Sequence, residues 1–278
     1  MIRMLVPDIE FYPRYLVNAM PKSGLHLIST MLGGLCVEQP PSHLHADAWV
    51  GTFKAFSWSR EWLPVPYTTY RLARLTPAHH MKGHVGFNKQ IEAFIAYSGV
   101  SHVFVYRDLR DVAVSQAYHI LSQDNERHKH PDKVLYYMQG KGTFDDVLAA
   151  VIEGVGPYPG VLERWEDYAP WLDSDWALVL RFEDVIADLR EAARQIVDYG
   201  VRHTIAPYRD VQLHIDPDKL DGALDDMVTL ANCKPLSPTF RKGKAGGWRE
   251  AFKPEHVELF KALDADGWIE KLGYSWDA

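Results

Sequence analysis

The sequence predicts an α/β protein in which a central parallel β-sheet is flanked by helices and the whole chain forms one domain. Apolar runs rich in β-branched and aromatic residues recur at residues 15–19, 101–108 and 176–184, and each leads into a segment with helical spacing. Strands that alternate with helices in this way build parallel sheets. The 278 residues, 47% of them hydrophobic, suffice for one large core, and we find no repeat or linker that divides them.

The first half of the chain supplies two strand and helix pairs. Residues 15–19 form a buried strand, and residues 25–35 form a helix whose apolar side carries Leu27, Ile28, Met31, Leu32 and Leu35. The pair Gly33-Gly34 weakens this helix near its end. A helix over residues 91–97 then stops at Gly99 before the second strand, and helical spacing returns over residues 108–121.

The segment from residue 40 to residue 80 loses all periodicity and is dense in aromatic residues and proline. Such a segment is typical of an irregular region around a pocket. Core packing accounts for part of its aromatic side chains, and the remainder suit an apolar or stacking ligand. These side chains are Trp49, Phe53, Phe56, Trp58, Trp62, Tyr67 and Tyr70.

The second half continues the alternation. Residues 144–155 and 161–171 have helical spacing and are separated by the turn-rich GVGPYPG. The third strand at residues 176–184 leads into a helix at 185–199. A loop rich in Gly and Lys at 235–248 precedes a closing helix at 254–263, which has proline at its start.

Composition excludes several classes of function. Lys and Arg number 30 against 37 Asp and Glu, a net charge of -7, so non-specific nucleic-acid binding is not expected. Cys36 and Cys233 lack the spacing of a disulfide framework or a structural zinc site. No apolar stretch approaches the roughly twenty residues that cross a bilayer, and the first residues lack a signal-peptide pattern. We therefore expect a cytoplasmic location without a transmembrane segment.

The turn between the first strand and the first helix carries an unexpected cation. Residues 19–27 read AMPKSGLHL. A strand that runs through a Gly-containing turn into a helix creates an anion site, because the first helical amides are unpaired and the helix dipole is positive there. Lys22 adds a full charge, Ser23 a hydroxyl, and Gly24 lets the backbone approach a phosphate closely. A solvated turn is the alternative, and the spacing of a Walker A loop is absent.

A second cationic segment, VFVYRDLRDVAVSQAYH at residues 103–119, follows the second strand. It places Arg107 at the end of a central strand, where open α/β sheets bind ligands, and Ser115 about two helical turns further on. Asp108 suits the helix N-cap, and Arg110 and Asp111 are expected to pair in the first turn.

The third segment is TFRKGKAGGW at residues 239–248. Arg241 and Lys242 before Gly243 form a cationic hinge that suits a phosphate. By itself this segment is more typical of a basic surface loop.

Together and in this order, the three segments resemble the nucleotide-binding elements of cytosolic-type sulfotransferases, which use 3'-phosphoadenylyl sulfate (PAPS). The resemblance implies their P-loop-like nucleotide-binding fold over residues 1–278. It implies transfer of a sulfuryl group from PAPS to a hydroxyl or amine of a small-molecule, lipid or sugar acceptor, with PAP as product. It also implies an acceptor-pocket insert at about residues 40–80 and a cofactor lid at about residues 235–250.

The resemblance also assigns site residues. The Pro-Lys-Ser-Gly turn resembles the loop that holds the 5'-phosphosulfate, and Arg107 with Ser115 resembles the 3'-phosphate motif. Phe182 in RFEDV takes the aromatic position near adenine. The lid motif assigns phosphate binding to Arg241, Lys242 and Gly243.

Departures from the family pattern indicate a divergent member. The family loop commonly continues Thr-Thr-Trp, whereas Leu25 and His26 follow Gly24 here. Their backbone amides are implied to hold the phosphate, with His26 in place of a hydroxyl. Leu109 replaces a usual proline, and Gly247 a usual aspartate.

Sulfuryl transfer needs in-line positioning, charge stabilisation on the leaving phosphate and a base for the acceptor proton. Lys22 suits the leaving phosphate, and no metal is required where lysine and amides neutralise its charge. The segment HMKGHVGF at residues 80–87 resembles the Lys-Thr-His element of the family, which makes His84 the general base and Lys82 an accessory cation.

Two other hypotheses stay open. One is a P-loop kinase-like phosphotransferase that uses ATP, for which Asp108 is the candidate magnesium ligand. The other is a non-catalytic binder of adenosine bisphosphate. Of the remaining histidines, His43 and His45 with Asp47 have metal-like spacing but no third cluster beside them, so we expect surface or acceptor-pocket positions for them and for the pair His79 and His80.

Overall fold

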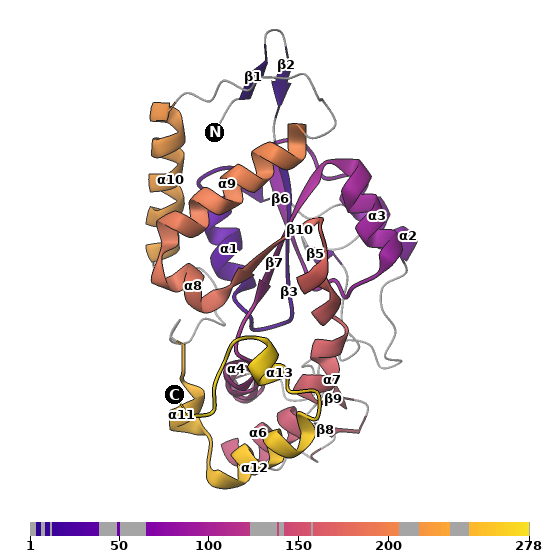
Figure 1. The fold of residues 1–278 in the computed structure, drawn as a ribbon, viewed down its shortest axis with the longest axis vertical. Coiled ribbons are helices and arrows are strands. Elements are labelled where there is room, and N and C mark those ends of the chain that lie inside the picture. Colours follow the sequence, from indigo (N-terminus) through magenta and orange to yellow (C-terminus); the bar gives the residue numbers. More distant parts are fainter. Residues whose placement is uncertain are drawn as a thin grey trace.

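The computed structural model describes residues 4–6, 9–11, 13–38, 49–50, 65–122, 138, 142–156, 158–205, 217–233 and 245–277. Its centre is a six-stranded parallel sheet with the strand order β10-β7-β3-β6-β4, in which β5 also pairs with β6 (Figure 1). The strands are β3 (Arg14–Ala19), β4 (Val37–Glu38), β5 (Trp49–Val50), β6 (His79–Gly83), β7 (Val100–Tyr106) and β10 (Ala177–Arg181). The predicted parallel α/β architecture is confirmed.

The carboxyl ends of four neighbouring strands meet at one edge of the sheet. In the register, Ala19 of β3 lies beside Val105 of β7, and Asn18 lies beside Gly83 of β6. Arg181 ends β10 opposite Tyr106. The chain passes from β3 to β6 on one side and then crosses to β7 on the other, so β3 is a topological switch point, where open sheets of this kind bind ligands.

Helices cover both faces of the sheet (Figure 1). One face packs on α1 (Leu25–Leu32), α8 (Phe182–Ala187), α9 (Leu189–Ile205) and α10 (Pro217–Asn232). The other face packs on α2 (Val65–Ala73), α3 (Lys89–Ser98), α7 (Val161–Glu166) and the 3-10 helix η3 (Ala169–Asp173). Successive side chains of a strand point to opposite faces of the sheet, so β3, β7 and β10 contribute residues to both cores.

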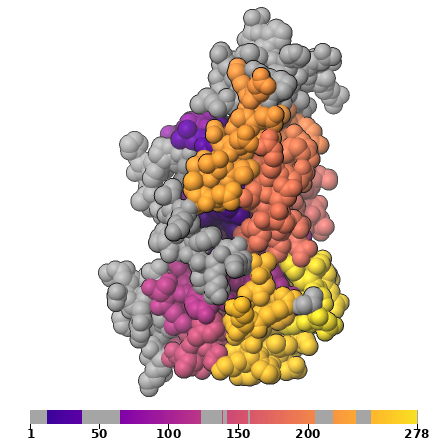
Figure 2. All heavy atoms as spheres, turned by 90° about the vertical axis from the view of Figure 1, so that its left-hand side faces the viewer, coloured from indigo at the N-terminus to yellow at the C-terminus, as the bar shows by residue number. Residues whose placement is uncertain are grey.

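A group of helices lies beyond the carboxyl ends of the strands, in the lower part of Figure 1. It comprises α4 (Leu109–Ser122), α6 (Phe144–Glu153), α11 (Trp248–Ala251), α12 (Pro254–Leu263) and α13 (Trp268–Lys271). Two hairpins complete the described elements: β1 (Met4–Val6) with β2 (Ile9–Phe11), and β8 (Gly154–Val155) with β9 (Tyr158–Pro159). In Figure 2, indigo atoms of the segment 13–38 show at the lower end of the orange α10.

Several predicted boundaries were wrong. The segment 40–80 is not wholly irregular, because α2 occupies residues 65–73 inside it. The predicted strand 176–184 ends at Arg181, where the backbone turns into α8. The predicted helix 185–199 is broken at Asp188 and its second part extends to Ile205.

The predicted helix 161–171 is likewise two short helices, α7 and η3, because Pro170 disfavours continuation of the α-helix before it. The first helix ends at Leu32 before the glycine pair, three residues earlier than predicted. Helix α10 was not predicted, although the helix at 254–263 has the predicted limits.

Candidate active site

The turn between β3 and α1 has an unusual backbone. Lys22 adopts a left-handed conformation with a φ of 74°, and Gly24 has a φ of 108°. The Ser23 amide donates to the Met20 carbonyl over 3.2 Å, which closes the turn. A lysine in the left-handed region is strained, and such strain is concentrated at functional sites.

The interior of this turn fits an anion. Ser23 is 1% exposed, and no hydrogen-bond partner for its Oγ lies among the described residues. A buried hydroxyl without a partner is costly unless a ligand supplies one. The side chain of Leu25 packs in the core, so only its backbone can face the turn, where α1 begins with the positive end of its dipole.

Phe182 joins the turn to the second cationic segment. A Cβ on Gly24 would lie 2.5 Å from Cδ2 of the Phe182 ring, so glycine is needed here for packing as well as for its positive φ. The Arg107 guanidinium lies over the same ring, 4.5 Å from its centroid. Phe182 follows β10 directly and is 5% exposed, and its ring therefore contacts both of the predicted anion-binding segments.

His84 follows β6 directly and is buried at the same edge. Its Nδ1 lies 2.6 Å from the carbonyl of Ala19, the last residue of β3. A carbonyl only accepts, so Nδ1 carries the proton and Nε2 is the basic nitrogen. Burial lowers the pKa of His84 to about 3, and the positive charges of His26, Lys22 and Arg164 act in the same direction. The imidazole is neutral at physiological pH, as a base must be.

Two side chains hold the segment that carries His84. Asn18 of β3 donates from Nδ2 to the Val85 carbonyl over 2.9 Å and accepts from the Val85 amide over 2.8 Å. The Trp171 indole also donates to the Val85 carbonyl over 2.9 Å. These bonds fix the backbone directly after His84. Sequence reasoning missed both side chains, although a polar residue inside the apolar strand YLVNA was a signal for Asn18.

Asp111 connects Arg107 to the segment that follows residue 244. Its Oδ2 accepts from Arg107 Nη2 over 3.1 Å and from the Gly246 amide over 2.8 Å. Its Oδ1 accepts from the Trp248 amide over 2.9 Å. The predicted pair of Arg110 with Asp111 is therefore wrong.

Arg110 pairs instead with Asp108. Its Nε and Nη2 donate to the Asp108 carboxylate over 2.9 and 2.8 Å, and Nη1 donates to the Ser275 carbonyl over 3.0 Å. Asp108 also accepts from the Arg110 amide over 2.9 Å, which makes it the predicted N-cap. A carboxylate held by a buried arginine is poorly suited to bind magnesium.

Other predicted site residues lie on β6, on α4 or outside the described residues. Lys82 lies on β6 beside Val17 and shares its side of the strand with His80. Ser115 is half-buried on α4. Arg241, Lys242 and Gly243 lie outside the described residues, as do His43, His45 and Asp47.

Sequence reasoning also missed two residues whose partners come from other elements. Arg164 of α7 is 1% exposed and donates to the Tyr158 hydroxyl over 2.8 Å. Glu183 follows Phe182 and accepts from the Tyr274 hydroxyl over 2.6 Å. Burial is the main cause that raises the pKa of Glu183.

His80 lies in the protein core, and its predicted position at the surface or in an acceptor pocket was wrong. It is 1% exposed, with Nε2 2.9 Å from Ser29 Oγ and Nδ1 3.4 Å from Cys36 Sγ. The two cysteines are free thiols. Within the described ranges, no group of three or more His, Cys, Asp or Glu side chains is arranged to hold a metal ion.

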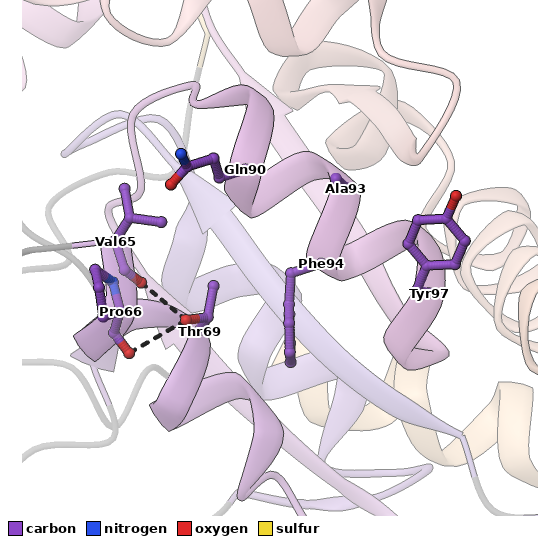
Figure 3. Close-up of a pocket in the computed structure, with 7 residues that line it drawn as sticks. All are labelled: Val65, Pro66, Thr69, Gln90, Ala93, Phe94 and Tyr97. Atoms are coloured by element: carbon purple, nitrogen blue, oxygen red, sulfur yellow. Dashed lines mark hydrogen bonds between the residues drawn. The ribbon is translucent and has the colours of Figure 1, made fainter.

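A separate apolar groove of about 450 Å³ lies between α2 and α3 (Figure 3). Its lining consists of Val65, Pro66, Thr69, Gln90, Ala93, Phe94 and Tyr97. The Thr69 hydroxyl donates within its own helix, to the carbonyls of Val65 and Pro66. The lining residues that the structure describes include no charged side chain and none of the predicted phosphate or base residues.

Comparison with known proteins agrees with this geometry. The family model described as "Sulfotransferase domain" matches residues 13–264, which include the strand ends, the Lys22 turn and His84. The chain belongs to the sulfotransferase domain family. Flavonol 3-sulfotransferase from Flaveria bidentis is 24% identical over 197 residues, which cover 62% of this chain and 54% of the plant enzyme. This sulfotransferase-domain chain thus spans about half the length of that relative.

Two solved structures share the fold of this sulfotransferase domain. The mouse sulfotransferase SULT7A1 complexed with PAP has a TM-score of 0.54 and 15% identity, over 95% of this chain and 85% of that one. Retinol dehydratase in complex with androsterone and the inactive cofactor PAP has a TM-score of 0.50 and 16% identity, over 91% of this chain and 80% of that one. At this identity the likeness shows a common fold.

Proposed function

We propose that this protein is a PAPS-dependent sulfotransferase, which transfers a sulfuryl group to a hydroxyl or amine of a small-molecule, lipid or sugar acceptor. The observation that carries the proposal is the placement of His84. Its Nδ1 is bound to the Ala19 carbonyl, and its basic Nε2 therefore belongs to a neutral imidazole at the strand edge that also carries Lys22. A binding protein needs no base at this position, whereas sulfuryl transfer does.

In this proposal the Lys22 turn holds the 5'-phosphosulfate of PAPS. Two observations support this role. The Ser23 hydroxyl has no hydrogen-bond partner among the described residues, and the backbone at Lys22 is left-handed. Gly24 and the amides of Leu25 and His26 complete the cradle at the start of α1. PAPS supplies an activated sulfuryl group whose leaving group is a phosphate, and the residues of the turn stabilise the charge left on that phosphate.

The other end of the nucleotide is assigned to the Arg107 region. Arg107 is fixed at the end of β7 and lies against Phe182, which supports a 3'-phosphate beside the guanidinium and adenine near the ring. Ser115 on α4 is the second 3'-phosphate residue. Arg241, Lys242 and Gly243 are proposed to complete phosphate binding as a lid, and they precede Gly246 in the sequence.

His84 acts as the general base in this proposal and receives the acceptor proton on Nε2. Burial and the nearby cations lower its pKa, and the negative charge of a phosphosulfate held at Lys22 opposes that effect. The imidazole is thus neutral before transfer, and its basicity rises when the anionic donor is present. Lys82 is proposed as an accessory cation.

The relatives favour a small hydroxyl-bearing acceptor. The plant relative is named for a flavonol, and retinol dehydratase was solved with androsterone. We propose that residues 40–80 line the acceptor pocket of a single domain. Among the described residues, no helix is long and apolar enough to span a bilayer, and we propose a cytoplasmic protein.

A thermal-shift titration tests the nucleotide assignment. We expect 3',5'-adenosine bisphosphate to raise the Tm without magnesium, and ATP to raise it much less, because only the bisphosphate occupies both anion sites. The reverse ranking supports the kinase hypothesis. Mass spectrometry of a metabolite extract incubated with protein and PAPS then identifies the acceptor by the gain of one sulfuryl group, and absence of any sulfated product supports a non-catalytic binder.

A further inference from the structure

The carboxylate of Asp111 occupies a central position beside the predicted 3'-phosphate site. It is 3% exposed and accepts three hydrogen bonds, from Arg107 and from the amides of Gly246 and Trp248. The three donors come from the end of β7 and from a segment more than a hundred residues later. This single side chain therefore links two of the elements that surround the proposed nucleotide.

Arg107 is held from two directions. Asp111 binds one Nη2 donor, and the Phe182 ring supports the guanidinium plane at 4.5 Å. A free arginine side chain loses rotamer entropy when a ligand fixes it. A guanidinium that is already fixed avoids most of that loss, so the pair preorganises Arg107 for an anion.

The later segment is held by the same helix turn. Trp248 begins α11 and is 5% exposed, and its ring packs 3.9 Å from the Arg110 guanidinium. Arg110 lies next to Asp111 in α4, and its guanidinium also lies over the Trp276 ring, 4.6 Å from the ring centroid. Polar contacts from Asp111 and ring contacts from Arg110 thus fasten α11 to the first turn of α4.

We propose that Asp111 is a positioning residue that aims Arg107 at a 3'-phosphate and anchors the start of α11 beside it. This inference rests on the proposed nucleotide-binding function. Repulsion between the Asp111 carboxylate and a phosphate would weaken phosphate binding. We expect this repulsion to be smaller than the gain from a positioned Arg107, because the three donors already compensate the charge of Asp111.

The test compares Asp111→Asn with Asp108→Asn, a matched control. Both aspartates are buried near the start of α4 and both bind an arginine, but Asp108 binds Arg110 and not Arg107. Calorimetry measures the affinity for 3',5'-adenosine bisphosphate and for adenosine 5'-monophosphate, which lacks the 3'-phosphate. We expect Asp111→Asn to reduce the preference for the bisphosphate about tenfold, or about 1.4 kcal/mol. Asp108→Asn should leave that preference unchanged.

In the Arg107→Ala background, Asp111→Asn should cause no further loss of preference, because it acts through that arginine. Hydrogen exchange supplies a second readout that needs no ligand. The amides of Gly246 and Trp248 should exchange faster in Asp111→Asn and at the wild-type rate in Arg107→Ala.

An unchanged or increased preference for the bisphosphate in folded Asp111→Asn overturns the inference, as does unchanged exchange at both amides. If wild-type protein does not bind the bisphosphate at all, the proposed function has failed instead. A Tm measurement on each variant confirms that the comparison is made on folded protein.

Discussion

The hydrogen bond between His84 and Ala19 decides which imidazole nitrogen carries the proton. Because Nδ1 donates to the carbonyl, the lone pair resides on Nε2. Asn18 and Trp171 then fix the adjacent backbone at Val85. The imidazole is therefore preorganised in one tautomer and one orientation, which suits the proposed role of general base.

Replacement of His84 by alanine should lower kcat by a factor of about 10² to 10⁴, the usual contribution of a general base. The affinity for 3',5'-adenosine bisphosphate should change less than about threefold, because the phosphates are assigned to other residues. Steady-state kinetics and calorimetry measure the two effects. His79→Ala on the same strand should keep full turnover. Equal turnover in His84→Ala and wild type removes His84 from the mechanism.

The turn between β3 and α1 depends on an element that is far away in sequence. Its local features, a strand, a Lys-Ser-Gly turn and a helix, are readable from residues 15–32. The contact of Gly24 with Phe182 cannot be predicted from these residues, because it joins this turn to the start of α8. Glycine at position 24 is thus required by the neighbouring element as well as by its own φ.

Gly24→Ala should destabilise the fold by about 1–3 kcal/mol, since the new Cβ is both strained and 2.5 Å from the Phe182 ring. Bisphosphate binding should weaken with it. Gly267→Ala is the control, because Gly267 also has a positive φ but a Cβ added there would have no atom within 4 Å among the described residues. Urea denaturation measures both variants, and an equal loss in the two would show that the contact with Phe182 is unimportant.

The protein as a whole buries several histidines in its two cores. His102 of β7 is 0% exposed, packs edge-on to Trp171 at 4.4 Å, and has no hydrogen-bond partner in the described part of the chain. Burial lowers its pKa to about 3, as it does for His84. Burial also lowers the pKa of His203.

Stability should consequently fall as the pH drops below about 6.5, the pKa of histidine in an unfolded chain. The unfolded state then binds protons at these histidines and the folded state does not, so the free energy of unfolding decreases with falling pH until about pH 3. Each histidine contributes up to about 1.4 kcal/mol per pH unit. Denaturation of wild type and His102→Phe at several pH values measures the difference.

His102→Phe keeps the apolar packing and removes one titrating group, so its stability should depend less steeply on pH between about 6 and 4. The same pH dependence in both proteins would show that His102 is accessible to protons in the folded state.

The parallel sheet and the turns at its edge could be read from the sequence, because they depend on local patterns. Apolar strands, helical spacing and the Pro-Lys-Ser-Gly turn are properties of neighbouring residues. Although Phe182 was expected inside the strand 176–184 and in fact follows β10, the placement of Lys22 and Arg107 at one edge follows as well, since each comes at or shortly after the end of a predicted strand of one parallel sheet. Such strands bring their carboxyl ends to a common edge.

The hydrogen-bond and ring partners of Arg110 and Asp111 are decided by the tertiary structure. Local spacing predicted a pair of Arg110 with Asp111, but packing of the C-terminal segment on α4 brought the Ser275 carbonyl and two tryptophan rings to Arg110. Asp111 then bonded to Arg107 and to amides 135 and 137 residues away. No local pattern encodes such contacts, because they form only after the sheet and its helices have brought distant segments together.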